Sequence, residues 1–197
     1  MCEFLSEIYS GVQQISNRKK GTGGAKHGKC EIIMCNISRR AFLLEERTNI
    51  LFLCTGNICR SPMAEFIMKK LVSDCGAGPE FVISSAACTS EETGNDIYPP
   101  AKRKLKEKGI PFTFHAARRV TKKDLDSADY VVVMDGRNTS RLFSDFGNSY
   151  AEKTYRILEF AGEDTDVSDP WYTGDFETAY TEIERGCRAL LEKCLKD

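Results

Sequence analysis

From Asn49 onward, short apolar runs alternate with stretches whose apolar residues recur at helical spacing. The runs predict strands near 49–54, 81–85, 130–134 and 154–158. Between and after them, the pattern predicts helices over 61–73, 100–108, 137–145 and 175–195, and one that begins at the capping box Thr121–Asp124. Strands that alternate with helices indicate βαβ units. The sequence therefore predicts an α/β fold, a four-stranded parallel sheet flanked by helices on both faces.

The chain is long enough for one domain. It has 197 residues, of which 41% are apolar, and this suffices to bury a single core. Residues 1–48 differ from the rest, because 17–24 is a polar, glycine-rich stretch and no clear period precedes it. We expect 1–48 to form a flexible extension ahead of a domain over 49–197.

Charge and composition exclude several classes of partner. The 28 basic and 29 acidic residues are mixed along the chain, so no basic face favours nucleic acid or anionic lipid. No stretch approaches the roughly 18 apolar residues of a membrane span, and the N-terminus lacks a signal-peptide pattern. We therefore expect a cytoplasmic monomer that binds neither nucleic acid nor membrane.

The spacing of the cysteines and histidines along the sequence does not predict a metal site. The nine cysteines are an odd set without a disulfide framework, and we expect most of them to be reduced thiols. The possible zinc ligands near the N-terminus are His27, Cys30 and Cys35, with Cys2 as the only other nearby candidate. Their spacings fit none of the usual pairs of zinc ligands. We expect neither a metal nor a cofactor.

The first predicted strand runs into a loop with the pattern C-x5-R-S, from Cys54 to Ser61. The strand brings Cys54 to the carboxyl edge of the sheet, while Ser61 is predicted to cap the next helix and Pro62 to open it. Gly56 and Asn57 tolerate positive φ, so the backbone N–H groups of the loop can converge on one anion. The sequence therefore predicts a phosphate-binding loop at the N-terminus of a helix.

The two ends of this loop have complementary chemistry. A nest of N–H groups at a helix N-terminus favours thiolate over thiol, which makes Cys54 a candidate nucleophile. The planar guanidinium of Arg60 can hold two phosphoryl oxygens and follow them into the transition state. The remaining loop residues would contact the phosphate or shape the loop: Thr55, Gly56, Asn57, Ile58, Cys59 and Ser61.

A candidate general acid lies much later in the chain, at Asp169. Pro170 follows it and restricts Asp169 to an extended conformation, so its carboxylate can project from a stiff loop. Trp171 and Tyr172 come next and could form the walls of a slot for a flat aromatic group. Asp169 could then protonate the departing oxygen of a phosphate ester.

Cys54, Arg60 and Asp169, in these two motifs and in this order, make residues 49–197 resemble the low-molecular-weight protein tyrosine phosphatases. The resemblance implies hydrolysis of phosphotyrosine in proteins without metal. Cys54 would form a phosphocysteine, and Arg60 and the loop amides would hold the phosphoryl oxygens. Asp169 would protonate the leaving group and then activate water, and Ser61 would steady the thiolate.

The resemblance also assigns supporting roles. Asn57 would hold the loop in a left-handed conformation through hydrogen bonds to Ser85 and His115. Cys59 would form a reversible disulfide with the nucleophilic cysteine under peroxide. Glu91 lies at the rim, where some members of the family have an aromatic residue, and we expect it to disfavour acidic substrate peptides.

Three other functions remain open at this point. Thioredoxin-coupled arsenate reductases share the fold but need a further cysteine pair, and the segment 130–138 has none. Protein arginine phosphatases share the start of the loop, but the apolar Ile58 followed by Trp171 and Tyr172 in the acid loop favours a phenyl ring. A catalytically silent phosphotyrosine-binding protein would have no use for both a nucleophile and an acid.

Overall fold

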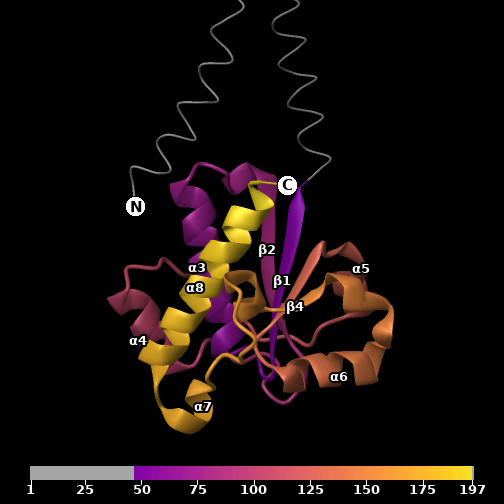
Figure 1. The fold of residues 1–197 in the computed structure, drawn as a ribbon. Helices are drawn as coiled ribbons and strands as arrows, with labels where there is room; N and C mark the ends of the chain where they lie inside the picture. Colours follow the sequence, from indigo (N-terminus) through magenta and orange to yellow (C-terminus); the bar gives the residue numbers. More distant parts are fainter. Residues whose placement is uncertain (1–46, 197) are drawn as a thin grey trace, which may run out of the picture. The chain divides into compact units, whose positions relative to one another are not determined.

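The computed structural model describes residues 47–196, and the predicted extension with His27, Cys30 and Cys35 lies outside the described residues. Four parallel strands form one sheet in the order β2-β1-β3-β4 (Figure 1). Their bounds are β1 Thr48–Cys54, β2 Phe81–Ala87, β3 Tyr130–Val133 and β4 Thr154–Arg156. The predicted parallel sheet is confirmed, although the fourth strand ends two residues early because the chain turns into a 3-10 helix at Ile157.

The helices connect and cover the strands. They are α3 Arg60–Asp74, α4 Pro99–Glu107, α5 Lys122–Ser127, α6 Gly136–Phe146, α7 Pro170–Thr173 and α8 Phe176–Cys194. Three 3-10 helices complete the described chain: η1 Gly78–Glu80, η2 Asn148–Lys153 and η3 Ile157–Ala161. The capping box that begins α5 is present as predicted, whereas α7 was not predicted.

Side chains of β1 alternate between two cores. Ile50 and Phe52 belong to a core that is completed by α3, α4 and α8. Leu51 and Leu53 belong to a second core, with residues of α5 and α6. Because successive side chains of a strand point to opposite faces, this division confirms that helices cover both faces of the sheet. No helix within residues 47–196 is long and apolar enough to cross a bilayer.

The start of α3 differs from the prediction. The helix begins at Arg60, Cys59 takes the N-cap position, and no side chain caps the free N–H groups. Ser61 lies inside the first turn, where its hydroxyl contacts Cys54 instead of capping the helix. Pro62 is tolerated there because the first N–H groups of a helix have no intrahelical partner. The uncapped N–H groups thus remain directed toward the C-x5-R-S loop.

The last helix approaches η3 at Gly186. A Cβ atom at this position would lie 2.6 Å from Ile157 Cγ1 and 2.7 Å from the Ile157 carbonyl oxygen. Only glycine fits without moving the backbone of η3. This contact helps to fix α8 against the rest of the domain.

The strand order determines where a site can form. The chain leaves the central strand β1 toward β2 on one side, and later adds β3 on the other side. Ligands bind at such a switch point, outside the carboxyl ends of the strands. Leu53 pairs with Val133, so the residues that follow these two leave the sheet side by side. Cys54 follows Leu53, and Asp135 lies two residues beyond Val133.

Candidate active site

The loop from Cys54 to Arg60 turns at a single left-handed residue. Asn57 has a φ of 58° and is the only residue other than glycine with positive φ among the described residues. Gly56, which we expected to share this role, does not have positive φ. Its lack of a side chain is used differently, because a Cβ there would lie 2.9 Å from Glu92 Cγ. Gly56 therefore lets Glu92 come close to the loop.

Asn57 is buried and held at all of its polar groups. Its Nδ2 donates to Ser61 Oγ and to Ser85 Oγ, both at 2.9 Å. Its Oδ1 accepts from the Arg118 backbone N–H at 3.3 Å, and its carbonyl oxygen accepts from His115 Nε2 at 2.9 Å. The left-handed conformation is therefore stabilised from β2 and from the segment after α4, before any ligand contacts the loop.

The Cys54 sulfur lies at the base of this loop and is almost fully buried. Ser61 Oγ lies 3.1 Å from Cys54 Sγ, and the Asn57 backbone N–H donates to the sulfur at 3.3 Å. Ser61 Oγ accepts from Asn57 Nδ2, and its own proton can be donated to Cys54 Sγ or to the Ala86 carbonyl oxygen, which lies 3.4 Å away. The Asn57 N–H and the Ser61 hydroxyl can therefore both donate to a sulfur that attacks as a nucleophile.

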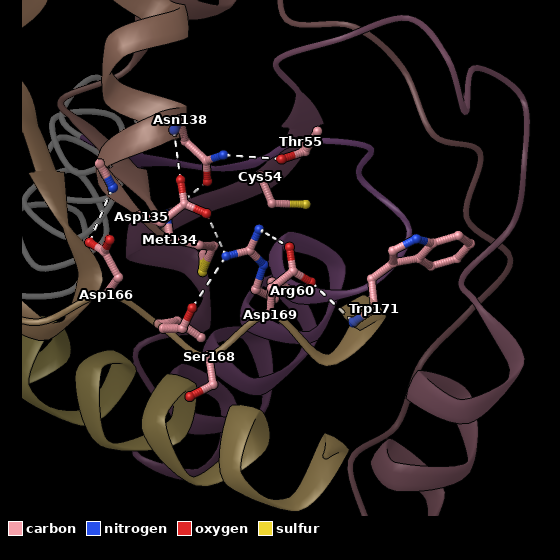
Figure 2. Close-up of polar contacts among 12 residues, drawn as sticks. Cys54, Thr55, Arg60, Met134, Asp135, Asn138, Asp166, Ser168, Asp169 and Trp171 are labelled. Carbon is pink, nitrogen blue, oxygen red and sulfur yellow. Dashed lines mark hydrogen bonds and ion pairs between the residues drawn. The ribbon is translucent and has the colours of Figure 1, made fainter. Parts of the chain in front are cut away.

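Arg60 is buried between two carboxylates (Figure 2). Its Nη1 donates to Asp135 Oδ2 at 2.7 Å and to the Val167 carbonyl oxygen at 3.3 Å, and its Nη2 donates to Asp169 Oδ2 at 2.7 Å. Burial lowers the pKa of Arg60, but the negative charges of Cys54, Asp169 and Asp135 outweigh burial and raise it overall. Arg60 is therefore a permanent cation.

The orientation of Arg60 leaves one edge of the guanidinium available. A guanidinium has five N–H groups, and three of them are used by the contacts to Asp135, Val167 and Asp169. The other two, on Nε and Nη2, make no hydrogen bond with any residue from 47 to 196. Two N–H groups on adjacent nitrogens match the spacing of two phosphoryl oxygens.

Asp135 is a site residue that the sequence analysis missed. It is the N-cap of α6, where its Oδ1 accepts from the Asn138 backbone N–H at 2.7 Å while Oδ2 holds Arg60. Asn138 in turn donates through Nδ2 to Thr55 Oγ1 at 3.3 Å. Asp135 and Asn138 thus connect Arg60 to Thr55, at the other end of the phosphate loop. A polar residue just after a buried strand is the sequence signal that could have identified it.

The loop that carries Asp169 is fixed by contacts to the end of β3 and to α8. The Val167 backbone N–H donates to the Met134 carbonyl oxygen at 2.9 Å, which attaches the loop to the end of β3. Glu182 on α8 accepts from the Ser168 backbone N–H at 2.8 Å and from its hydroxyl at 3.2 Å. Asp169 follows directly and N-caps α7 through the Trp171 N–H at 3.0 Å.

These groups surround one pocket of about 210 Å³. It is lined by Cys54, Thr55, Gly56, Ile58, Cys59, Arg60, Glu91, Glu92, Asp169, Trp171 and Tyr172. Trp171 and Tyr172 form an aromatic wall and are 53% and 78% exposed, so both can contact a ligand. Trp171 packs on Tyr98, with ring centroids 5.1 Å apart.

Cys59 also lines the pocket, but it differs from a nucleophilic cysteine in its protonation state. Burial, together with the charges of Cys54 and Asp169, raises the pKa of Cys59 to about 12. It is therefore a thiol at neutral pH. Its reversible disulfide with Cys54 stays a prediction.

The structure brings together ten of the predicted site residues around the pocket and places the other four behind it. Asn57, Ser61, Ser85 and His115 form the support of the loop. Four contributors were missed: Glu92 at the pocket wall, Tyr98 packed on Trp171, and Asp135 and Glu182 behind Arg60 and Asp169. None of the four belongs to the two motifs that carried the prediction.

A cysteine, an arginine and a carboxylic acid around one phosphate-sized loop define the class of cysteine-dependent phosphatases. The comparison with known families gives the same class. Residues 49–197 match the sequence model of the family described as low molecular weight phosphotyrosine protein phosphatase. The chain belongs to this family, and the predicted family resemblance is confirmed.

Relatives cover the same part of the chain. The human low molecular weight phosphotyrosine protein phosphatase is 39% identical over 153 residues, which are 74% of this chain and 94% of the relative. The crystal structure of YfkJ from Bacillus subtilis is 37% identical, with a TM-score of 0.73, over 76% of this chain and 96% of that chain. The YwlE arginine phosphatase from Geobacillus stearothermophilus is 31% identical, with a TM-score of 0.66, over 76% and 94%.

Proposed function

We propose that this chain hydrolyses phosphotyrosine in proteins through a phosphocysteine at Cys54. The observation that carries the proposal is the convergence of three groups on one pocket with an aromatic wall: the Cys54 sulfur, the available edge of Arg60 and the carboxyl group of Asp169. As a family member, the chain acts on phosphoproteins, and the proposal specifies the phosphorylated residue and the residues that act on it.

In the first step, the phosphoryl group binds on the loop N–H groups and on the Nε and Nη2 edge of Arg60. Asp169, which Arg60 holds beside this edge, enters the step as the protonated acid. The Cys54 sulfur attacks phosphorus, the bond from phosphorus to the phenolic oxygen breaks, and Asp169 gives that oxygen its proton.

In the second step, Asp169 is a carboxylate and removes a proton from water as the water attacks the phosphocysteine. The bond between sulfur and phosphorus breaks, and inorganic phosphate forms. Cys54 leaves as a thiolate, which Ser61 Oγ and the Asn57 N–H stabilise by hydrogen bonds. Arg60 keeps its contacts to Asp135 throughout, so its charge stays in place for both steps.

The phenyl ring of phosphotyrosine fits the pocket wall better than a guanidinium would. Ile58 is apolar, and Trp171 and Tyr172 provide flat apolar surface beside the phosphate loop. A guanidinium has only donors, and the carboxylates of Glu91 and Glu92 at this pocket can accept from it, so the apolar wall is the feature that favours a phenyl ring. The arginine phosphatase among the similar structures makes phosphoarginine the right competitor substrate.

Phosphate release from matched phosphotyrosine and phosphoarginine peptides, without added metal, tests the proposal. We expect turnover of phosphotyrosine that is abolished in Cys54→Ser and kept in the control Cys75→Ser, a cysteine outside the pocket. A preference for the phosphoarginine peptide would show that phosphoarginine, and not phosphotyrosine, is the substrate. Tight binding of phosphotyrosine without turnover would instead indicate a binding protein.

We also propose that residues 49–197 act as a cytoplasmic monomer and that residues 1–48 are dispensable for chemistry. Mixed surface charge and the completeness of the pocket within one chain support the first statement. The test is light scattering with activity for the full chain and for 47–197. A dimer, or loss of activity in the shorter chain, would contradict it.

A further inference from the structure

A second hollow lies against the active-site pocket, on the other side of Trp171. It is a groove of about 550 Å³ between α4 and the start of α8, and it includes Tyr98, Arg103, Pro170 and Phe176. Trp171 lines both the pocket and the groove. A polypeptide whose phosphorylated side chain occupies the pocket can therefore continue across Trp171 into the groove.

The carboxylates of this groove are already used by neighbours. Glu177 accepts from Lys104 at 2.8 Å and from Lys108 at 2.5 Å, and Glu107 accepts from Lys104 at 2.8 Å. Asp175 is the N-cap of α8 and accepts from the first turn of that helix. These bonds lower the pKa values of Glu177 and Asp175, which stay ionised and partnered.

Arg103 is the exception among the charged residues of the groove. It is exposed on α4, and it makes no hydrogen bond or ion pair with any residue of the described chain. Five N–H donors on a planar cation are thus available at the groove, which Tyr98 and Trp171 also line. Such a group pairs well with a carboxylate from a bound partner.

We propose that the groove binds the substrate segment next to the phosphotyrosine, and that Arg103 pairs with an aspartate or glutamate in this segment. The proposal rests on the proposed function. Continuity with the active-site pocket through Trp171 argues for a substrate segment, and the available cation argues for an acidic side chain. Glu91, at the pocket itself, makes no ion pair within residues 47–196 and disfavours acid there. The enzyme thus selects peptides by where the acidic residue lies, and not by net charge.

The test is a set of phosphotyrosine peptides in a neutral background, with one Asp or one Lys placed in turn at each of the four positions on either side. We expect an Asp peptide to exceed the matching Lys peptide in kcat/KM by about two- to fivefold at one position or an adjacent pair, the range of an exposed ion pair. The preference should invert in Arg103→Glu. It should persist in Lys106→Glu, a matched charge reversal on α4 outside the groove.

Turnover of p-nitrophenyl phosphate, which is too small to reach the groove, should be equal in all three proteins. Equal effects of the two charge reversals on the peptides, or no positional preference, would overturn the proposal. A change in molecular mass in Arg103→Glu, without a change in selectivity, would overturn it in favour of a second copy as the occupant. Failure of the intact protein on p-nitrophenyl phosphate and on all peptides would overturn the proposed function itself.

Discussion

Removing the Glu182 carboxylate tests how the acid loop is positioned. Glu182 contacts neither the pocket nor Asp169, but it binds the backbone N–H and hydroxyl of Ser168, the residue before the acid. In Glu182→Ala, the loop keeps its bond from Val167 to β3 and the ion pair to Arg60. We therefore expect a folded enzyme whose general acid is less well placed.

The size of the effect follows from the lost contacts. Hydrogen bonds to a charged group contribute about 1.5–3 kcal/mol, and Glu182 is half-buried, so the lower end applies. About 1.5 kcal/mol corresponds to roughly tenfold in rate. This loss should appear in kcat/KM for phenols with a pKa of about 10, such as tyrosine, because they need a proton to leave. For much more acidic phenols, we expect less than about threefold.

The assay is kcat/KM for a series of aryl phosphates of different leaving-group pKa. The dependence on leaving-group pKa should be steeper in Glu182→Ala than in the parent. Glu182→Gln should recover most of the activity, because its amide oxygen still accepts from Ser168 N–H. Glu184→Ala, on the same helix and paired with Arg188, is the control. An equal loss for all leaving groups, or equal activity of the Gln and Ala variants, would refute the positioning role.

Three further outcomes follow from contacts described above. Gly186→Ala should lower the free energy of unfolding by about 1–3 kcal/mol, measured in urea, because its Cβ overlaps Ile157; unchanged stability would mean that η3 moves freely. Asp135→Asn should keep the α6 cap, since Asn caps well, but reduce kcat/KM about tenfold by weakening the hold on Arg60; normal activity would contradict that role. Burial raises the pKa of Cys88 to about 12, above about 8.5 in an unfolded chain, so its stabilisation is complete below pH 8.5 and is lost as the pH rises toward 12. Stability, measured as the unfolding midpoint, should therefore decrease as the pH is raised from about 9 to 11, and it should decrease less steeply in Cys88→Ala. An equal dependence on pH in the two proteins would exclude this cause.

The sequence predicted the sheet well because its strands are buried. An apolar run such as Tyr130–Val133 between polar turns has few alternatives to a central parallel strand. The helix starts were less predictable. Serine is a residue type typical of an N-cap, but Ser61 lies inside the first turn of α3, where its hydroxyl contacts Cys54 and Asn57, and only the folded loop brings these groups together.

The site residues that were not predicted from the sequence were missed for one physical reason. Asp135 and Arg60 are 75 positions apart, and the place of this aspartate just after a buried strand does not indicate which residue it binds. Glu182 lies on the polar side of a long helix, where glutamate is common and needs no partner. Residues that position other residues have ordinary local sequence, whereas Cys54 and Asp169 are surrounded by unusual loop residues.

The pairing of Leu53 with Val133 has a consequence for how the enzyme loses activity on heating. The nucleophile and the carboxylate that anchors the arginine leave neighbouring strands just beyond this pair, and their separation is set by the spacing of strands, about 4.8 Å. The central ladder cannot open without separating them, and they cannot separate while it is closed. Thermal inactivation and the melting of the sheet should therefore be a single event.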